Sequence, residues 1–239
     1  MKKRNQEQKH NFIYRNFKTA LIDLKKERGY VGIASIIFIG VAILGFFMPM
    51  FFEDKVRELI QELILKTMGL SPLELTQFII ANNMTSSFIA MIMGIFLMIP
   101  SIAIIVINGY VIGVVANKSV EVAGITILWR LLPHGIFEIP AILISVGLGI
   151  KIGFNIMHNC IRKYNKKMHP LAESVLIVLS LVIFPFAFFF YIFATLIDKQ
   201  LRKNFSKNLI DALRIFVFIV IPLLIIAGII EGILIVLVA

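Results

Sequence analysis

The feature that most constrains this chain is a set of five long, strongly apolar runs. Runs of about 18 or more apolar residues are long enough to cross the hydrocarbon core of a membrane as helices. The chain is 59% hydrophobic and 16% charged, whereas soluble domains are about 45–50% apolar and about 25% charged. Too little polar surface is available to cover a soluble core. The predicted spans are residues 30–52, 84–107, 134–157, 172–197 and 213–238.

The predicted fold is therefore all-α: a polytopic transmembrane helix bundle with five clear spans and additional amphipathic interfacial helices. Residues 109–132 are ambiguous, because Lys118 and Glu121 interrupt their hydrophobicity. We interpret them as a buried, broken or re-entrant segment, and a sixth crossing is the alternative. Counting Lys and Arg on the two sides favours five crossings by a small margin, and both versions place the N-terminus in the cytoplasm.

Two regions differ in charge. Residues 1–29 contain nine Lys or Arg and three acids, with apolar residues at helical spacing. This pattern predicts a basic amphipathic helix on the cytoplasmic membrane surface, and we expect no nucleic acid partner. Residues 30–239 form the predicted transmembrane domain, which includes a polar helical insert at 53–83. The expected location is the cell membrane, with several passes.

The insert carries clear signals for the ends of two helices. An apolar stripe predicts an amphipathic helix over residues 53–68, and Gly69 suits its C-terminal cap. Ser71 and Glu74 have the spacing of a capping box, and Pro72 occupies the first helical position. We therefore expect two short helices here, on the outer side of the membrane.

Polar residues within apolar spans are the candidate functional residues, because each costs free energy to bury. His134 and Glu138 are four residues apart and share a helix face, so they are able to hydrogen-bond. Glu231 lies in the last span and needs a partner or a proton. Candidate partners for Glu231 are His134, Arg130 and an asparagine such as Asn108. A polar clamp between helices and an ion or proton path are the two interpretations of these residues.

Small residues at helical spacing indicate close helix packing. Ser145, Gly149 and Gly153 form a stripe on the third predicted span, and Gly228 and Gly232 form another beside Glu231. Small side chains let helix backbones approach closely in membranes. We expect these stripes to pack against a neighbouring span or a second copy of the chain.

Motifs for catalysis, cofactors and metals are absent from the sequence. There is no His-Glu-x-x-His, no Gly-x-Ser-x-Gly and no phosphate-binding loop. The single cysteine, Cys160, excludes an internal disulfide and a cysteine-pair metal site. Two neighbouring ligands, His134 and Glu138, are too few for a closed zinc site. The sequence predicts no metal, no cofactor and no enzymatic activity.

One run resembles a known family. The sequence Leu132–Ala141, which contains His-Gly-x-x-Glu-x-Pro, resembles the signature of the stage II sporulation protein M family. Further similar elements follow the same order along the chain: Asn82–Asn83, Asn108–Gly109, Gly113 and Ala227–Gly232. The resemblance implies a multi-span membrane protein without established catalysis, and a role in recruiting partner enzymes at the membrane.

Two functional hypotheses follow. The first is a non-enzymatic membrane scaffold that contacts the lipid bilayer and recruits other membrane or envelope proteins, with a homo-oligomer as one form. The second is a transporter or permease component with Glu231 and the His134–Glu138 pair on an ion or proton path. An intramembrane hydrolase ranks behind both. A dry helix bundle favours the first hypothesis, and a polar cavity reaching Glu138 or Glu231 favours the second.

Overall fold

The computed structural model describes the backbone of residues 2–165 and 168–238, and the side chains of 12–128, 135–165 and 168–234. It is 92% helical, without a strand in the described residues. The helices are α1 (Lys2–Lys26), α2 (Arg28–Phe47), α3 (Glu53–Thr67), α4 (Pro72–Ile92), α5 (Ile99–Ala123), α6 (Leu128–Tyr164), α7 (Pro170–Val182), α8 (Phe186–Ile197), α9 (Lys199–Ile215) and α10 (Ile221–Val238). Short helical turns are η1 (Pro49–Phe51), η2 (Met93–Ile95), η3 (Ile125–Ile127) and the π-helical η4 (Phe216–Val220).

Five helical segments in the described chain are long and apolar enough to cross a membrane. This confirms the predicted all-α, multi-pass membrane fold. Their boundaries differ from those expected from hydrophobicity. The segments are Arg28–Phe47, Pro72–Ile95, Ile99–Ala123, Gly135–Tyr164 and Lys199–Leu234.

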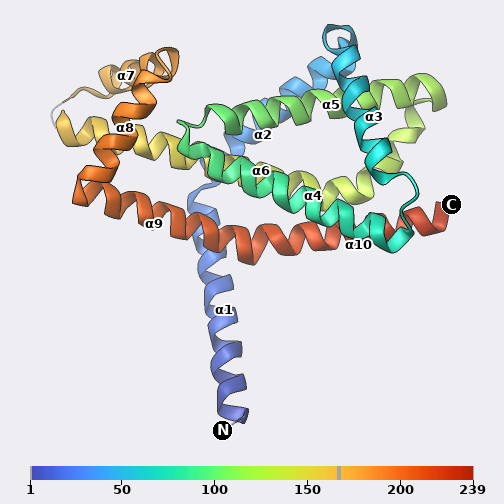
Figure 1. Cartoon of the computed structure of the whole chain (residues 1–239), viewed down its shortest axis with the longest axis horizontal. Coiled ribbons are helices and arrows are strands. Elements are labelled where there is room, and N and C mark those ends of the chain that lie inside the picture. Colours follow the sequence, from blue (N-terminus) through green and yellow to red (C-terminus); the bar gives the residue numbers. More distant parts are fainter. Residues whose placement is uncertain (1, 166–167, 239) are drawn as a thin grey trace.

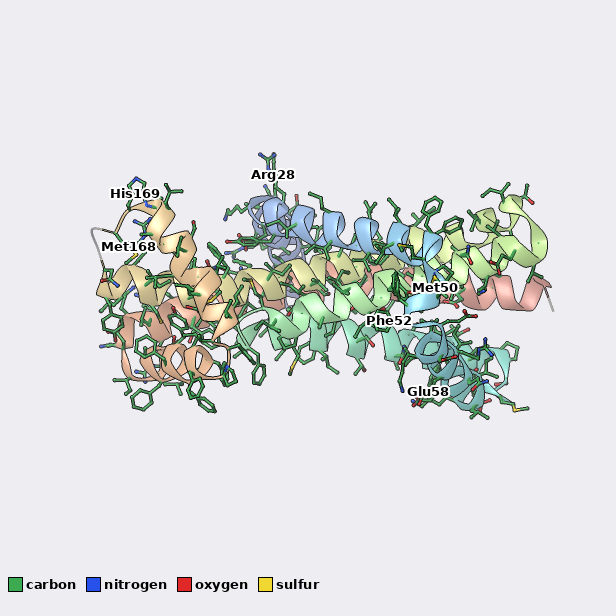
Figure 2. The ribbon with its side chains drawn as sticks, turned by 90° about the horizontal axis from the view of Figure 1, so that it is seen from above. Arg28, Met50, Phe52, Glu58, Met168 and His169 are labelled. Atoms are coloured by element: carbon green, nitrogen blue, oxygen red, sulfur yellow. The ribbon has the colours of Figure 1, made fainter. Side chains whose placement is uncertain are left out.

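The long helices lie side by side, with α6 packed against α2, α4, α5, α9 and α10 (Figure 1). Helix α1 leaves this bundle crosswise to the long helices from the half that carries α7 and α8, and α3 lies crosswise near the end of the other half. We call these the α1 end and the α3 end. Figure 2 shows the same two ends from above, with Arg28 at the start of α2 and Glu58 on α3 outside the bundle.

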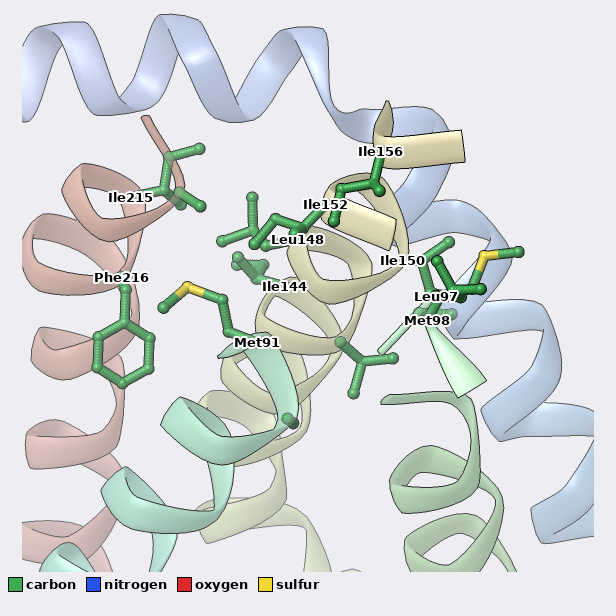
Figure 3. Close-up of a cluster of buried hydrophobic side chains, with 14 of the residues drawn as sticks. Met91, Leu97, Met98, Ile144, Leu148, Ile150, Ile152, Ile156, Ile215 and Phe216 are labelled. Carbon is green, nitrogen blue, oxygen red and sulfur yellow. The ribbon is translucent and has the colours of Figure 1, made fainter. Parts of the chain in front are cut away.

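The apolar core follows α6 along its length. Leu148, Ile152 and Met157 of α6 are fully or almost fully buried, as are Met91 of α4 and Ile215 of α9. Figure 3 shows Met91, Leu148, Ile152 and Ile215 in the space between α6 and its neighbours. The core therefore consists of aliphatic side chains from helices far apart in the sequence, centred on one long helix.

Helices α2 and α5 form a second close contact, through glycine. A Cβ on Gly113 would lie 2.1 Å from the carbonyl oxygen of Ala42, and one on Gly109 would lie 2.9 Å from that of Phe38. The hydroxyl of Tyr110 donates to the carbonyl of Met48, at 2.8 Å. The two backbones therefore touch directly, as small residues permit in membrane helices.

The predicted second span, 84–107, is interrupted. The chain reverses at Met93–Met98, where Leu97 and Met98 have positive φ of 51° and 61°. Helix α4 starts at Pro72, so the second helix of the expected insert continues as a span instead of ending at residue 83. The hydroxyl of Ser101 donates to the carbonyl of Ala90 across the turn, at 2.7 Å. Because the turn is apolar and packed against α6, hydrophobicity does not reveal it.

Because the second span does not have the predicted boundaries, the structure of residues 109–132 also differs from the prediction. Helix α5 continues to Ala123, so the first part of this segment completes a crossing-length helix and is not broken or re-entrant. Lys118 lies at the α3 end, 3.2 Å from Glu121 and 3.6 Å from Glu53. The charges that argued against a crossing therefore lie at a helix end and are paired.

The predicted fourth span, 172–197, is two short helices with a bend of 115° between them, and Pro185 lies at the break. Residues 198–211, which lie between the predicted fourth and fifth spans, belong mostly to helix α9, which continues through η4 into α10. By contrast, the local signals of the insert are confirmed. The Ser71–Glu74 capping box is formed, with Pro72 in the first turn, and Gly69 has φ of 81° just after α3.

Candidate functional site

The most polar part of the described interior lies at the α1 end, where α1, α6 and α9 meet. The Lys151 ammonium of α6 is 2.7 Å from the Glu27 carboxylate between α1 and α2, and their side chains are only 7% and 13% exposed. Burying a single charge is costly, whereas the attraction within a close ion pair offsets part of that cost. Lys151 therefore holds the start of α2 against α6.

A second ion pair joins α1 to α9. The Arg214 guanidinium lies 3.1 Å from Asp23 and 3.0 Å from Asp211, and Asp23 also binds Lys26 at 2.8 Å. Burial alone would raise the pKa of Asp23. Hydrogen bonds and attraction from Lys26 and Arg214 outweigh burial and lower that pKa below its ordinary value of 3.8. We call Asp23, Glu27, Lys151 and Arg214 the charged cluster.

The charged cluster borders a cavity of about 570 Å³. Two asparagine pairs line it, each with helical spacing: Asn155 and Asn159 on α6, and Asn204 and Asn208 on α9. Charges and amides suit water or polar groups, because each offers donors and acceptors. The described residues hold no group of three or more His, Cys, Asp or Glu that would bind a metal ion. The ion pairs of the charged cluster therefore suit attachment of α1 to the rest of the bundle.

Asp23→Asn is expected to release α1 from α9, because Arg214 loses its carboxylate partner on α1. Hydrogen exchange of the backbone amides of α1 after residue 12 should become faster. Acid should have the same effect. A carboxyl whose folded pKa is lowered stabilises the fold above its unfolded pKa, and this contribution is lost as the pH falls through the folded value, below 3.8.

Asp211→Asn is the matched control for that experiment. Asp211 contacts the same guanidinium but lies on the helix of Arg214 itself. Its loss leaves the bond between α1 and α9 in place, so exchange in α1 should stay slow. Equal acceleration in both variants would contradict attachment of α1 through Asp23.

The intramembrane candidates lie elsewhere, toward the other half of α6. Glu138 of α6 and Glu231 of α10 are close enough for their negative charges to repel each other. Glu231 also has another interaction, so it is not an isolated carboxyl group. The side chains of His134 and Arg130 lie outside the described residues, so the predicted His134–Glu138 pair stays a prediction. Asn108 donates to the carbonyl of Ile104 on its own helix, at 2.8 Å.

The predicted packing residues lie at helix contacts. A Cβ on Gly149 would be 2.5 Å from the Ala90 carbonyl oxygen, and one on Gly153 would be 2.3 Å from the Met98 nitrogen. Ser145 is fully buried and donates to Ala141 on its own helix. Gly228 and Gly232 face α4, and a Cβ on either would lie 2.2 Å from a side-chain atom, of Ile80 and Thr76 respectively.

Comparison with known proteins identifies the family of the chain. The sequence profile of the stage II sporulation protein M family matches residues 34–234, most of the chain. The chain belongs to this family. An uncharacterised protein of Methanocaldococcus jannaschii is 31% identical over 108 residues, which are 43% of this chain and 47% of that protein. The chain thus spans about half the length of this curated relative. No solved structure matches.

The family match includes only part of the site. Lys151 and Arg214 lie within residues 34–234, whereas Asp23 and Glu27 precede them. The His-Gly-x-x-Glu-x-Pro element lies in α6, which is helical throughout Leu128–Tyr164 despite Pro133 and Pro140. The family element and the charged cluster therefore occupy different parts of the same long helix.

Sequence reasoning missed the charged cluster. No motif in the sequence singles out Lys151, yet its side chain is buried and paired with Glu27. One signal was present: two of the three acids in residues 1–29, Asp23 and Glu27, are four residues apart. Acids at helical spacing on an otherwise basic helix indicate a partner for that face.

Proposed function

We propose that the chain is a non-enzymatic scaffold of the cell membrane that docks other membrane or envelope proteins. The proposal rests on the position and exposure of helix α3. It is attached to the bundle mainly through Val56, which packs with Tyr110 and Val114 of α5. Its remaining surface is exposed, and Figure 2 shows it standing apart from the long helices. A helix held out in this way is suited to contact another molecule.

The exposed face of α3 has the character of a protein contact. Leu59, Ile60, Leu63 and Ile64 form an apolar stripe, and each is 36–55% exposed. The helix carries four acids and three bases, several of them paired along the helix. Helices that bind anionic lipid are rich in Lys and Arg. An apolar stripe bordered by both signs of charge instead matches a helix that docks a protein partner.

The close packing of the bundle supports a scaffold over a transporter. Direct backbone contacts at Gly149 and Gly153 leave no room even for a methyl group between α6 and the α4–α5 turn. The polar cavity at the α1 end is not lined by Glu138 or Glu231. The proximity of these two carboxyls is the observation that favours an ion or proton path. Glu138→Gln should leave proton flux across reconstituted vesicles unchanged if the scaffold proposal is right.

The docking proposal predicts a partner that depends on the α3 stripe. The tagged chain is crosslinked in its native membrane and purified, and co-purifying proteins are quantified by mass spectrometry. A stoichiometric partner should be present with the native chain and lost with Leu59→Ser/Leu63→Ser, because the double change removes the centre of the stripe.

Lys55→Ser/Lys66→Ser is the matched control, since it changes two exposed charged side chains on the same helix. The partner should be retained with this variant. Recovery of the chain alone, or only with other copies of itself, would contradict docking of a different protein. Partner retention by the stripe variant would exclude α3 as the docking element.

A further inference from the structure

Helices α7 and α8 have an inverted distribution of polarity. Their polar side chains Glu173, Ser180 and Thr195 are buried, and Ser180 hydrogen-bonds Tyr191 at 2.7 Å. Residues 174–197 contain no charged side chain. Apart from Ser174, which donates to the Pro170 carbonyl of its own helix, the exposed positions are apolar; the large ones are Leu171, Val175, Val178, Leu179, Val182, Ile183, Phe186, Phe189, Phe190, Phe193, Leu196 and Ile197. Exposed apolar surface of this extent indicates contact with lipid or protein rather than with water.

Both ends of this helix pair are attached to the same end of α6. Near the start of α7, Glu173 binds Arg162 at 2.8 Å and also contacts His158. Just after α8, Asp198 binds Lys163 at 2.9 Å. Arg162 and Lys163 are adjacent in the last turns of α6. The pair therefore begins and ends at one side of the bundle, as Figure 1 also shows.

Each helix is too short to cross a membrane. Helices α7 and α8 have 13 and 12 residues, or about 20 and 18 Å at about 1.5 Å per residue. The hydrocarbon core is about 30 Å thick. The bend of 115° between the helices prevents them from acting as one straight span. Length and direction together therefore fit a hairpin that enters and leaves on one side.

The hairpin is continuous with the lipid-facing surface of the bundle. Phe188 of α8 stacks on Phe96 of the α4–α5 turn, with ring centroids 4.9 Å apart. Residues 92–100, which form that turn, contain no polar side chain. An apolar turn belongs within the apolar layer, and Phe96 is itself partly exposed. The hairpin therefore extends the surface that α4 and α5 present to lipid.

We propose that α7–α8 is a re-entrant hairpin whose apolar face lies in one leaflet of the membrane. A protein partner is less suited to this face, because protein interfaces have a polar rim and the exposed side of the hairpin lacks charge. Backbone groups within each of the two helices are satisfied internally, and the amides of Ile183 and Ala187 also bond across the bend, which lowers the cost of inserting the hairpin. The chain then crosses the membrane five times, and the α7–α8 connections remain on the side of α1.

The distribution of Lys and Arg assigns this side to the cytoplasm. In the re-entrant topology one side contains nineteen of the 24 basic residues: nine in 1–29, five in 151–169 and five in 198–214. The other side contains five, three in 53–71 and two in 118–130. If α7–α8 crossed, the numbers would be fourteen and ten. Cytoplasmic loops carry the excess of Lys and Arg, so the hairpin lies in the cytoplasmic leaflet.

Cysteine labelling tests the topology. The native thiol, Cys160, is buried and is replaced by serine. Single cysteines are introduced at the exposed residues Asn165, Ser206 and Gln61. A membrane-impermeant maleimide should label Asn165→Cys and Ser206→Cys only in inside-out vesicles, and Gln61→Cys only in right-side-out vesicles. Labelling of Asn165→Cys and Ser206→Cys in opposite preparations would overturn the proposal, because the hairpin would then cross.

Spin labels test the contact with lipid. Phe189→Cys and Phe193→Cys, at positions 70% and 67% exposed, carry a nitroxide in the purified chain reconstituted in lipid vesicles. Collisions with oxygen, which concentrates in lipid, should be frequent, and collisions with a water-soluble nickel chelate should be lost. Ser206→Cys on α9 is the control and should show the reverse. Low access to both reagents would indicate a protein cover, and high access to nickel would indicate water. Either result contradicts lipid insertion without bearing on docking at α3.

Discussion

Lys151→Met is expected to lower the free energy of unfolding by about 3 kcal/mol, because it leaves the Glu27 carboxylate largely buried without its partner. Breaking one half of a buried ion pair costs about 3–5 kcal/mol. The lower end applies here, since the cavity beside the pair gives Glu27 access to water. The measurement is reversible unfolding in mixed detergent micelles, followed by far-ultraviolet circular dichroism.

A double change distinguishes a lost pair from lost packing. Lys151→Met/Glu27→Gln removes both charges, so it should be more stable than Lys151→Met alone. Lys55→Met breaks an exposed pair with Glu58 and should leave stability unchanged, because both side chains are well solvated. A double variant as unstable as the sum of the two single variants would show that Lys151 and Glu27 act independently.

The sequence contained the local features of this fold. Helix ends at Gly69, Ser71 and Pro72 formed as predicted, because caps depend on residues within one turn of each other. The abundance of apolar residues was enough to predict a membrane bundle of five spanning segments. Both inferences rest on short-range chemistry or on composition, which do not depend on how distant helices meet.

The assignment of residues to spans failed where packing determines the chain path. The turn at Met93–Met98 is as apolar as the spans beside it, since α6 and α8 cover it. Only Gly94 and Pro100 marked it in the sequence. Because this reversal was not predicted, the expected boundaries of α4 and α5 were wrong, and a crossing helix was interpreted as a re-entrant segment. The re-entrant geometry we propose instead belongs to α7–α8, which the sequence predicted as one continuous span, 172–197.

The charged cluster was unpredictable for a related reason. Glu27 and Lys151 are far apart in sequence, and no local spacing pairs them. The family signature drew attention to His134 and Glu138, yet the polar cavity lies in the other half of α6. The stripes of small residues could be predicted from their spacing. The identity of the helices that pack against them could not.

Gly153→Ala is expected to lower the free energy of unfolding by about 3 kcal/mol, at the upper end of the usual cost of overpacking. The new methyl group would lie 2.3 Å from the Met98 nitrogen, 2.6 Å from the Gly94 oxygen and 2.8 Å from the Leu97 carbonyl carbon. All three are backbone atoms of a tight turn with positive φ. No side chain can rotate away, so α6 and the α4–α5 turn must separate.

Gly40→Ala on α2 is the control, because no atom lies within 4 Å of its added methyl group. It should be neutral or slightly stabilising, since alanine is the better helix former. Gly94→Ala meets the backbone of Gly149 at 2.1 Å, from the opposite side of the same contact. One separation of the helices relieves both clashes, so Gly94→Ala/Gly153→Ala should cost less than the sum of the single variants. Strict additivity would show that each glycine has an independent contact.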